Sequence, residues 1–430
     1  MKSFAFCAVA LAASVVGAAT PTVTGMSVSQ EKGTKVVTIS YTIDEPAVIT
    51  LEMLTNGFPV AETDLTTLQG EMNCRVEAGP HAFIWVPYAE PGLGAHPERS
   101  VPGGLTVRLT AWAVDNPPDW MVADLRSDHA KDVRFYVTSN AIPGGIGSDT
   151  YKTDKLVMRK VHARNVEWMM GAPPGEKGLS ANSDKAKYSR FHRVTLTNDY
   201  YLGIYEVTQR QCEHATGSAY SGFTYEEDSP MRPVDKTHMG TCRGGTSTAG
   251  YKWPDKGHEV APNSIMDLFR RRTGIEIDLP TSAQWEFACR AGCTAALYSG
   301  WELVESYGTD AHLGEIAWYK GNASEGGTSN QTHVVGKKLP NAWGFYDMLG
   351  NVNEWVLDCL YADYTSLEPR IEPVGPPNTS STQRSFRGGG YGNEPYENRC
   401  AYISNIDAWY GPQMNRGLRL WAPAYAPAKE

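Results

Sequence analysis

The sequence has no apolar run of about 18 residues beyond its N-terminal stretch, so no membrane-spanning helix is expected in the mature chain. It also lacks a basic stripe: 39 Lys and Arg face 48 Asp and Glu, which gives a formal net charge of -9. Nucleic-acid binding depends on clustered positive charge. A nucleic acid is therefore not an expected partner.

Motifs for transition metals are missing as well. C-x-x-C does not occur, and Cys289 and Cys293 have no second pair at zinc spacing, so a structural zinc site is not expected. The 10 histidines form no H-x-H or H-x-x-x-H pair. This scatter gives a non-haem iron site no support, although it does not exclude one.

The N-terminus, "MKSFAFCAVALAASVVGAAT", places one Lys before an apolar run that ends in small residues. This pattern predicts a secretory signal peptide over residues 1–19, cut after Ala18 or Ala19; the alternative is a buried N-terminal helix. The mature protein is then exported, to the periplasm, the cell surface or the medium. Seven cysteines remain, an odd number, so at least one, such as Cys74, stays free or pairs between molecules.

Two domains are expected from the change in pattern along the chain. In residues 20–140, short alternating segments such as "VTISYTI" and "LTVRLTAW" predict a β-sandwich, with Asn56-Gly57 as a turn. A Pro- and Gly-rich linker is expected at 141–155. Residues 156–424 are then an α+β domain with much irregular structure, because short Gly-punctuated segments surround a few helices and there is no strand–helix–strand rhythm.

Two helices of the second domain have clear ends. In "PTSAQWEFACRAG", Thr281 and Gln284 form a capping box, and Gly292 is expected to stop the helix. In "SIMDLFRRRTG", apolar residues recur at helical spacing and Gly274 ends the segment.

Five segments then identify a family resemblance. They occur in the order "VEWMMG", "RVTLTNDYYLGIYEVTQRQCE", "DLPTSAQWEFACRAG", "NAWGFYDMLGNVNEW" and "RSFRGGGY … NRCAY … NRGLRLW". Together they resemble the formylglycine-generating-enzyme family, or sulfatase-modifying-factor domains, over nearly all of residues 160 to 422. The resemblance implies a compact C-type-lectin-like fold. The strand region before it resembles bacterial immunoglobulin-like modules, which implies a spacer or docking role.

The resemblance does not carry over the family's oxidation chemistry. Formylglycine-generating enzymes oxidise a cysteine of a sulfatase, using oxygen and a copper ion held by two cysteines after the Arg-Gly-Gly motif. Here that interval, from Arg387 to Cys400, reads "RGGGYGNEPYENRC" and contains no internal cysteine. Because Cu(I) requires thiolates, copper is not expected. In the related iron-dependent sulfoxide synthases, the histidine ligands lie mainly on a helical domain, whereas here the extra domain is a β module.

The stretch "GFYDMLGNVNEW" resembles the family's structural calcium loop. The resemblance implies side-chain ligands from Asp347 and Glu354 and carbonyl ligands from Gly350, Val352 and Met348. Calcium prefers six to eight oxygen ligands, which suits such a loop. The alternative is a tight turn capped by its own Asp. Asn353 replaces the Trp of many relatives, which puts the local packing in doubt.

The resemblance also implies a disulfide between Cys289 and Cys400; the alternative is two buried thiols. A second family disulfide is not expected, because Arg272 and Leu420 hold its positions. Arg387 and Arg419 are interpreted as structural residues paired with buried carboxylates such as Glu286 or Glu354, since a lone buried arginine is costly. A contact with a substrate anion is the alternative.

A ligand groove is expected where the family's active cleft opens; its alternative is rim packing. Its residues are Tyr391, Asn393, Glu394, Tyr396 and Trp409. The sequence thus predicts a non-catalytic binding or scaffolding protein for a peptide, a carbohydrate or a sulfatase-like partner. The alternatives are an oxidoreductase with a different metal site and a structural component of the cell envelope.

Overall fold

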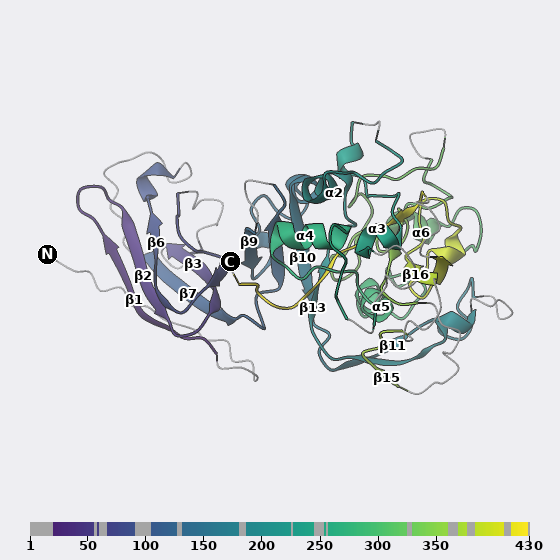
Figure 1. Ribbon diagram of the computed structural model, residues 1–430, viewed down its shortest axis with the longest axis horizontal. Coiled ribbons are helices and arrows are strands. Elements are labelled where there is room, and N and C mark those ends of the chain that lie inside the picture. Colours follow the sequence, from purple (N-terminus) through teal and green to yellow (C-terminus); the bar gives the residue numbers. More distant parts are fainter. Residues whose placement is uncertain are drawn as a thin grey trace. The chain divides into compact units, whose positions relative to one another are not determined.

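The computed structural model describes residues 20–55, 58–59, 67–90, 105–126, 131–179, 186–224, 227–244, 253–254, 257–324, 329–359, 369–375, 383–407 and 414–428. The chain forms two compact units (Figure 1). The first contains the residues up to Val122, Val133–Ser148 and the C-terminal residues from Ala424. The second contains Ala123–Asp132 and Asp149–Pro423. The predicted signal peptide, residues 1–19, lies outside the described residues.

Two antiparallel sheets build the first unit. One has the strand order β1-β2-β6, and the other has β4-β3-β5 with β7 paired to β3. The strand bounds are β1 Val23–Gln30, β2 Val37–Ile43, β3 Ala47–Thr55, β4 Phe58–Pro59, β5 Cys74–Val76, β6 Gly79–Trp85 and β7 Leu105–Ala113. β8 (Trp120–Asp124), within which the division between the units falls, and β9 (Val133–Tyr136) follow.

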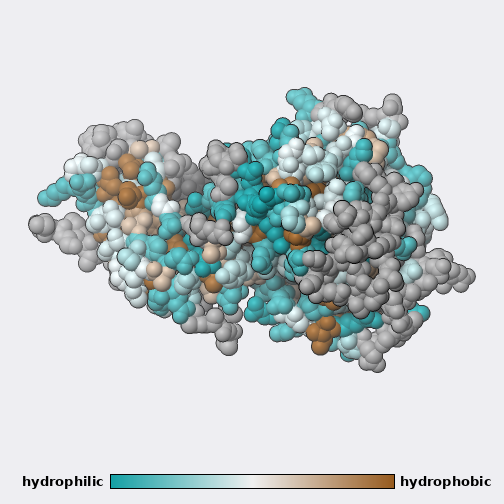
Figure 2. Space-filling view, viewed as in Figure 1, coloured by the Kyte–Doolittle hydropathy of each residue, from teal (hydrophilic) through white to brown (hydrophobic). Residues whose placement is uncertain are grey.

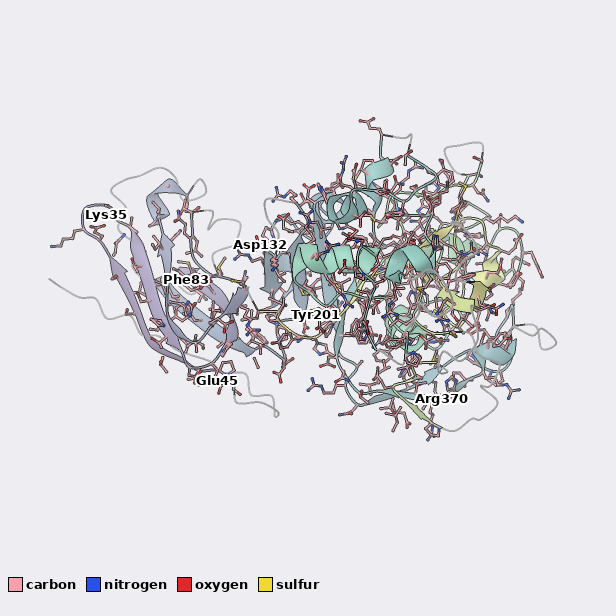
Figure 3. The ribbon with its side chains drawn as sticks, viewed as in Figure 1. Lys35, Glu45, Phe83, Asp132, Tyr201 and Arg370 are labelled. Carbon is pink, nitrogen blue, oxygen red and sulfur yellow. The ribbon has the colours of Figure 1, made fainter. Side chains whose placement is uncertain are left out.

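The alternating pattern of the sequence is confirmed in β2. Every second residue, from Val37 to Ile43, is buried, and these side chains share one core with β3, β6 and β7. Phe83 of β6 lies inside this core, whereas Lys35 projects outward from the turn after β1 (Figure 3). The Asn56-Gly57 turn lies outside the described residues. Burial of alternate residues on both sheets therefore holds the unit together.

Short helices punctuate the second unit. Their bounds are α1 Thr150–Thr153, α2 Gln209–Thr216, α3 Met239–Arg243, α4 Ile265–Thr273, α5 Ser282–Arg290 and α6 Ala311–Ile316. The capping box of Thr281 and Gln284 at α5 is confirmed. The C-terminal end of α5 differs from the prediction, because Ala291 already adopts a left-handed φ of 46° before Gly292 is reached. No described helix is long and apolar enough to cross a bilayer.

Three small groups of strands complete the second unit. β19, β13 and β10 are neighbours, β11-β12-β15 form a three-stranded sheet, and β17-β16-β14-β18 form a four-stranded sheet. The bounds are β10 Lys155–Val161, β11 Val166–Met170, β12 His192–Leu196, β13 Tyr200–Gly203, β14 Asn353–Trp355, β15 Arg370–Ile371, β16 Gln383–Arg387, β17 Ile403–Asp407, β18 Arg416–Gly417 and β19 Trp421–Pro423. The fold is thus mixed α and β with mostly sheet structure. Tyr201 of β13 lies inside it (Figure 3).

The division of the chain differs in detail from the expected boundaries. α1 and the first residue of β10 lie within the segment 141–155 that was expected to be a linker. The C-terminal residues return to the first unit, where Ala426 N donates to Val114 O at 2.8 Å and Arg75 donates to Ala426 O at 3.0 Å. A backbone hydrogen bond to a distant segment of the chain cannot be predicted from local composition.

Candidate functional site

The loop before β14 curls because several of its residues take left-handed conformations. Asp347 has a φ of 53°, Gly350 of 84° and Asn351 of 57°. Asp and Asn tolerate this region better than other non-glycine residues. At Gly350 a glycine is required, because a Cβ there would lie 2.5 Å from Trp318 O. The result is a tight, buried loop whose backbone turns several times.

Asp347 has one carboxylate oxygen to spare. Oδ2 accepts a hydrogen bond from Gly336 N at 2.6 Å, whereas Oδ1 is buried and has no hydrogen-bond partner. Burial raises the pKa of Asp347 to about 6, against the opposing effects of the Gly336 hydrogen bond and Arg419. An orphaned carboxylate oxygen in a curled loop fits a hard cation.

Glu354 is already well occupied. Trp285 Nε1 donates to its Oε2 at 2.6 Å, and Arg419 Nη2 lies 2.7 Å from its Oε1. Arg387 pairs with Glu286 at 2.9 Å. Both arginines predicted to be structural therefore lie beside the two carboxylates that the sequence suggested as partners. As a calcium ligand, Glu354 would have to share oxygens that already accept hydrogen bonds.

A third buried carboxylate, Glu206, was not predicted from the sequence. It accepts hydrogen bonds from Asn351 Nδ2 at 2.7 Å and Val352 N at 3.1 Å, and so holds the loop from outside. Burial, followed by the charges of Asp347 and Glu354, raises its pKa well above the ordinary value. The signal was an ionisable residue inside the apolar run "LGIYEV". Glu206 and Asp347 thus act on the Arg419 guanidinium through their charge, whereas Glu354 pairs with it directly.

The sulfur atoms of Cys289 and Cys400 lie 3.7 Å apart, as two buried thiols. Burial, and then the neighbouring thiol, raise the pKa of Cys289 well above its ordinary value. Cys289 is on α5 and Cys400 follows the 3₁₀ turn Pro395–Glu397. The fold therefore brings together the two cysteines that the resemblance pairs, which are 111 positions apart.

The predicted groove residues do not share one role. Tyr391 is buried and meets Phe223 edge-on, with 5.7 Å between ring centroids. Glu394 pairs with Lys320 at 2.5 Å and accepts from Gly308 N at 3.0 Å. Tyr396 lies 5.3 Å from the ring of Tyr307. Trp409 lies outside the described residues.

Asn393 joins a network of three asparagines. Its Oδ1 accepts from Asn353 Nδ2 at 2.9 Å and from Asn415 Nδ2 at 3.0 Å. Asn353 Nδ2 also donates to Asn415 O at 3.0 Å. The amide at position 353 is therefore accommodated by hydrogen bonds in place of apolar packing. These residues come from β14, from the segment after β16 and from the approach to β18, so their meeting could not be read from spacing.

The family model for the "Sulfatase-modifying factor enzyme 1-like domain" matches residues 155–422. The chain belongs to this family.

Several known proteins are moderately similar to the chain. The "Chaperone protein LppX" of Paenibacillus barcinonensis is 29% identical over 269 residues, which cover 57% of this chain and 86% of the relative. The formylglycine-generating enzyme of Mus musculus is 33% identical over 235 residues, covering 49% and 62%. That of Thermomonospora curvata is 35% identical over 147 residues, covering 33% and 48%. This chain thus spans less than two thirds of both enzymes.

Among solved structures, PvdO from Pseudomonas aeruginosa is 20% identical, with a TM-score of 0.48, and the match covers 62% of this chain and 94% of PvdO. Treponema denticola variable protein 1 is 23% identical, with a TM-score of 0.45, and the match covers 63% and 95%.

One interval distinguishes this sulfatase-modifying-factor domain from the copper-binding pattern that the family resemblance implies. Between Arg387 and Cys400, Asn393 takes part in the asparagine network and Glu394 in an ion pair. Cys400 is fully buried beside Cys289. Among the described residues, no group of three or more His, Cys, Asp or Glu side chains is arranged to hold a metal ion.

Proposed function

We propose that the protein is an exported, non-catalytic member of the sulfatase-modifying-factor family that binds a polypeptide through its second unit. The observation that carries the proposal is the network of Asn353, Asn393 and Asn415. One of its members, Asn393, lies in the interval from Arg387 to Cys400, in which the resemblance implies copper thiolates. Neutral amides supply neither a Cu(I) ligand nor a thiol that can pair with a substrate cysteine. They do supply donors and acceptors that suit a peptide backbone.

A relative supports a polypeptide as the partner. LppX, which is matched over 86% of its length, carries the name of a chaperone protein. Phe223, which is half-buried and contacts the buried Tyr391 edge-on, gives a partner's apolar side chain a surface to pack on. A peptide therefore accounts for both the polar and the aromatic groups better than a sugar alone.

The proposal includes a structural calcium ion in the loop before β14. Asp347 Oδ1 and the carbonyls of Met348, Gly350 and Val352 would hold it, while Glu206 adds negative charge behind the loop. Glu354 remains chiefly the partner of Arg419. A bound calcium ion supplies positive charge that keeps Asp347 ionised and fixes the carbonyls of the loop. No step of chemistry depends on it.

Export would account for two further features, a disulfide and the role of the first unit. In an oxidising compartment, the thiols of Cys289 and Cys400 are close enough for a small shift to form the disulfide. The first unit would act as the immunoglobulin-like spacer or docking module. Both features support a stable binding protein that works outside the cytoplasm.

The direct test is an oxidation assay on the full mature chain. The protein, loaded with calcium and then separately with Cu(I), is incubated in air with a peptide that contains the target cysteine of a sulfatase. Mass spectrometry of the peptide is expected to show no conversion of cysteine to aldehyde. Catalytic conversion above the level of free copper would contradict the proposal.

A further inference from the structure

Among the described residues, Arg416 has no counter-ion. Its guanidinium carbon lies 4.7 Å from the centre of the Phe386 ring, and its Nε is buried without a hydrogen-bond partner. Within the part of the chain that the structure describes, no carboxylate forms an ion pair with it. Asp235, whose backbone oxygen accepts from Arg416 N at 3.0 Å, uses only Oδ1 of its carboxylate to accept from Gly222 N, and its Oδ2 is buried without a hydrogen-bond partner. Arg387 and Arg419, by contrast, each have a carboxylate partner.

The surroundings make this lone charge costly. Arg416 is half-buried between aromatic residues, and burial lowers its pKa from the ordinary value. A charge that is partly removed from water and has no partner destabilises a fold, because nothing replaces its lost hydration. Such a charge is expected where a ligand supplies the missing partner.

Two acceptors beside Arg416 are also unsatisfied. Asn353 and Arg416 are register partners in the parallel strands β14 and β18, so their side chains leave the same face of the sheet. Asn353 is 2% exposed, and its Oδ1 has no hydrogen-bond partner. Asn415 Oδ1 is likewise buried and unpartnered.

The orientation of these amides follows from their other bonds. Asn353 Nδ2 donates both to Asn393 Oδ1 and to Asn415 O, and a flipped amide would lose both bonds. Asn415 Nδ2 also donates to Asn393 Oδ1. Oδ1 of Asn353 and of Asn415 are therefore acceptors in need of donors.

A planar guanidinium pairs best with a carboxylate, and unpaired amide oxygens accept from N–H groups. A peptide presents both within a few atoms. We propose that Arg416 binds a peptide carboxylate, while Asn353 and Asn415 accept hydrogen bonds from neighbouring peptide N–H groups. An apolar side chain of that peptide then packs on the outer side of the Phe223–Tyr391 pair, whose ring centroids are 5.7 Å apart. This inference rests on the proposed function and adds which groups of the peptide are recognised, a carboxylate and its neighbouring N–H groups.

The test uses the full mature chain and three probes in isothermal titration calorimetry: N-acetylated trialanine with a free carboxylate, the same peptide as its C-terminal amide, and sulfate. The free carboxylate is expected to bind about tenfold or more tighter than the amide, since a charged hydrogen-bonded pair contributes at least about 1.4 kcal/mol. Arg416→Gln is expected to abolish this preference, and Arg416→Lys to retain part of it. The matched control is Arg193→Gln, because Arg193 and Glu167 are both exposed.

Thermal unfolding without ligand separates a binding role from a structural one. Arg416→Gln is expected to unfold at the same temperature as the wild type or a higher one, because it removes an unpaired charge. A loss as large as that of Arg419→Gln would overturn the inference. Sulfate binding as tightly as the peptide would identify a site for free oxyanions and also overturn it. Peptide binding that survives Arg416→Gln would reject Arg416 but leave the proposed function standing.

Discussion

Arg419 and Glu354 form an ion pair that is almost completely removed from water. Arg419 Nη2 lies 2.7 Å from Glu354 Oε1, Arg419 Nε lies 3.0 Å from both carboxylate oxygens, and the two side chains are 0% and 1% exposed. Arg419 also donates to Gly203 O and Tyr346 O. It therefore links β13 and the loop before β14 to the segment between β18 and β19. This pair therefore fixes Glu354 next to the proposed calcium loop.

Removing one member of this pair should be far more harmful than removing an exposed charge. Arg419→Met leaves Glu354 buried and uncompensated, which is expected to lower the free energy of unfolding by about 3–5 kcal/mol. Arg193→Gln, at an exposed position, should change it by less than about 0.5 kcal/mol. Urea unfolding followed by tryptophan fluorescence measures both. Equal effects of the two variants would show that the buried pair does not stabilise the second unit.

Calcium should stabilise the protein through Asp347. At a calcium concentration of about 100 times the dissociation constant, the stabilisation is about 2.7 kcal/mol, so chelation should lower the melting temperature by several degrees. Asp347→Asn should unfold at a temperature that calcium no longer affects. Asp267→Asn, at a half-buried position of α4 beside Arg271, is the matched control and should keep the calcium response. A melting temperature of the wild type that ignores chelation would remove calcium from this loop.

Cys289 and Cys400 should be joined in protein purified from an oxidising compartment. Peptide mapping under non-reducing conditions is expected to find the cross-linked pair. On the chain-entropy model, a closed loop of this length contributes roughly 4 kcal/mol, less any strain. The double variant Cys289→Ala/Cys400→Ala should therefore melt at a lower temperature and lose the sensitivity to dithiothreitol. Free thiols at both positions in the exported protein would contradict this prediction.

Asp358 should make stability depend on pH. Burial raises its pKa to about 6, although Ser282 N donates to its Oδ2 at the start of α5 and Arg387 lies near. The raised pKa means that folding favours the protonated form, so its contribution is complete below about pH 4 and is lost as pH rises through about 6. The shift corresponds to roughly 2–3 kcal/mol.

The comparison of Asp358→Asn with the wild type isolates this group. The amide can still accept from Ser282 N but carries no charge. The stability of the variant relative to the wild type is expected to rise between pH 5 and pH 8, as measured by urea unfolding at each pH. A difference that stays constant over this range, or that favours the wild type as pH rises, would show that Asp358 titrates at its ordinary value.

Much of the architecture can be predicted from local sequence patterns. The Thr281 and Gln284 capping box fixes the start of α5, and Gly274, with a left-handed φ of 72°, ends α4 as expected. The alternation over Val37–Ile43 reports one buried strand face. These features depend on neighbours within a few residues, so periodicity and capping chemistry reveal them.

The polar network could not be predicted in the same way. Asn353 and Arg416 meet because β14 and β18 pair in parallel over two residues, far too short a contact to leave a pattern. Glu206 reaches the loop before β14 from a different part of the chain. In each case tertiary contacts decide whether a polar residue binds a ligand, forms an ion pair or makes a structural hydrogen bond. The family resemblance predicted the loop and the groove residues but not these partners.

The described surface indicates less about a ligand than the buried polar groups do. Hydrophilic residues cover most of the described surface in this view, with small hydrophobic spots between them (Figure 2). Tyr307, which is 69% exposed, lies against Tyr396 at the edge of the predicted groove. Scattered apolar residues of this kind are normal on a folded surface and identify no partner by themselves. The buried unpaired groups around Arg416 are the stronger guide to a ligand.

The metal content of the purified mature protein tests the central claim most directly. Inductively coupled plasma mass spectrometry, before and after chelation, is expected to find calcium at about one ion per chain and neither copper nor iron in stoichiometric amount. That result is the one predicted for a binding protein with a structural calcium loop. Copper or iron near one ion per chain would contradict the account and indicate an oxidase site built without the cysteine pair.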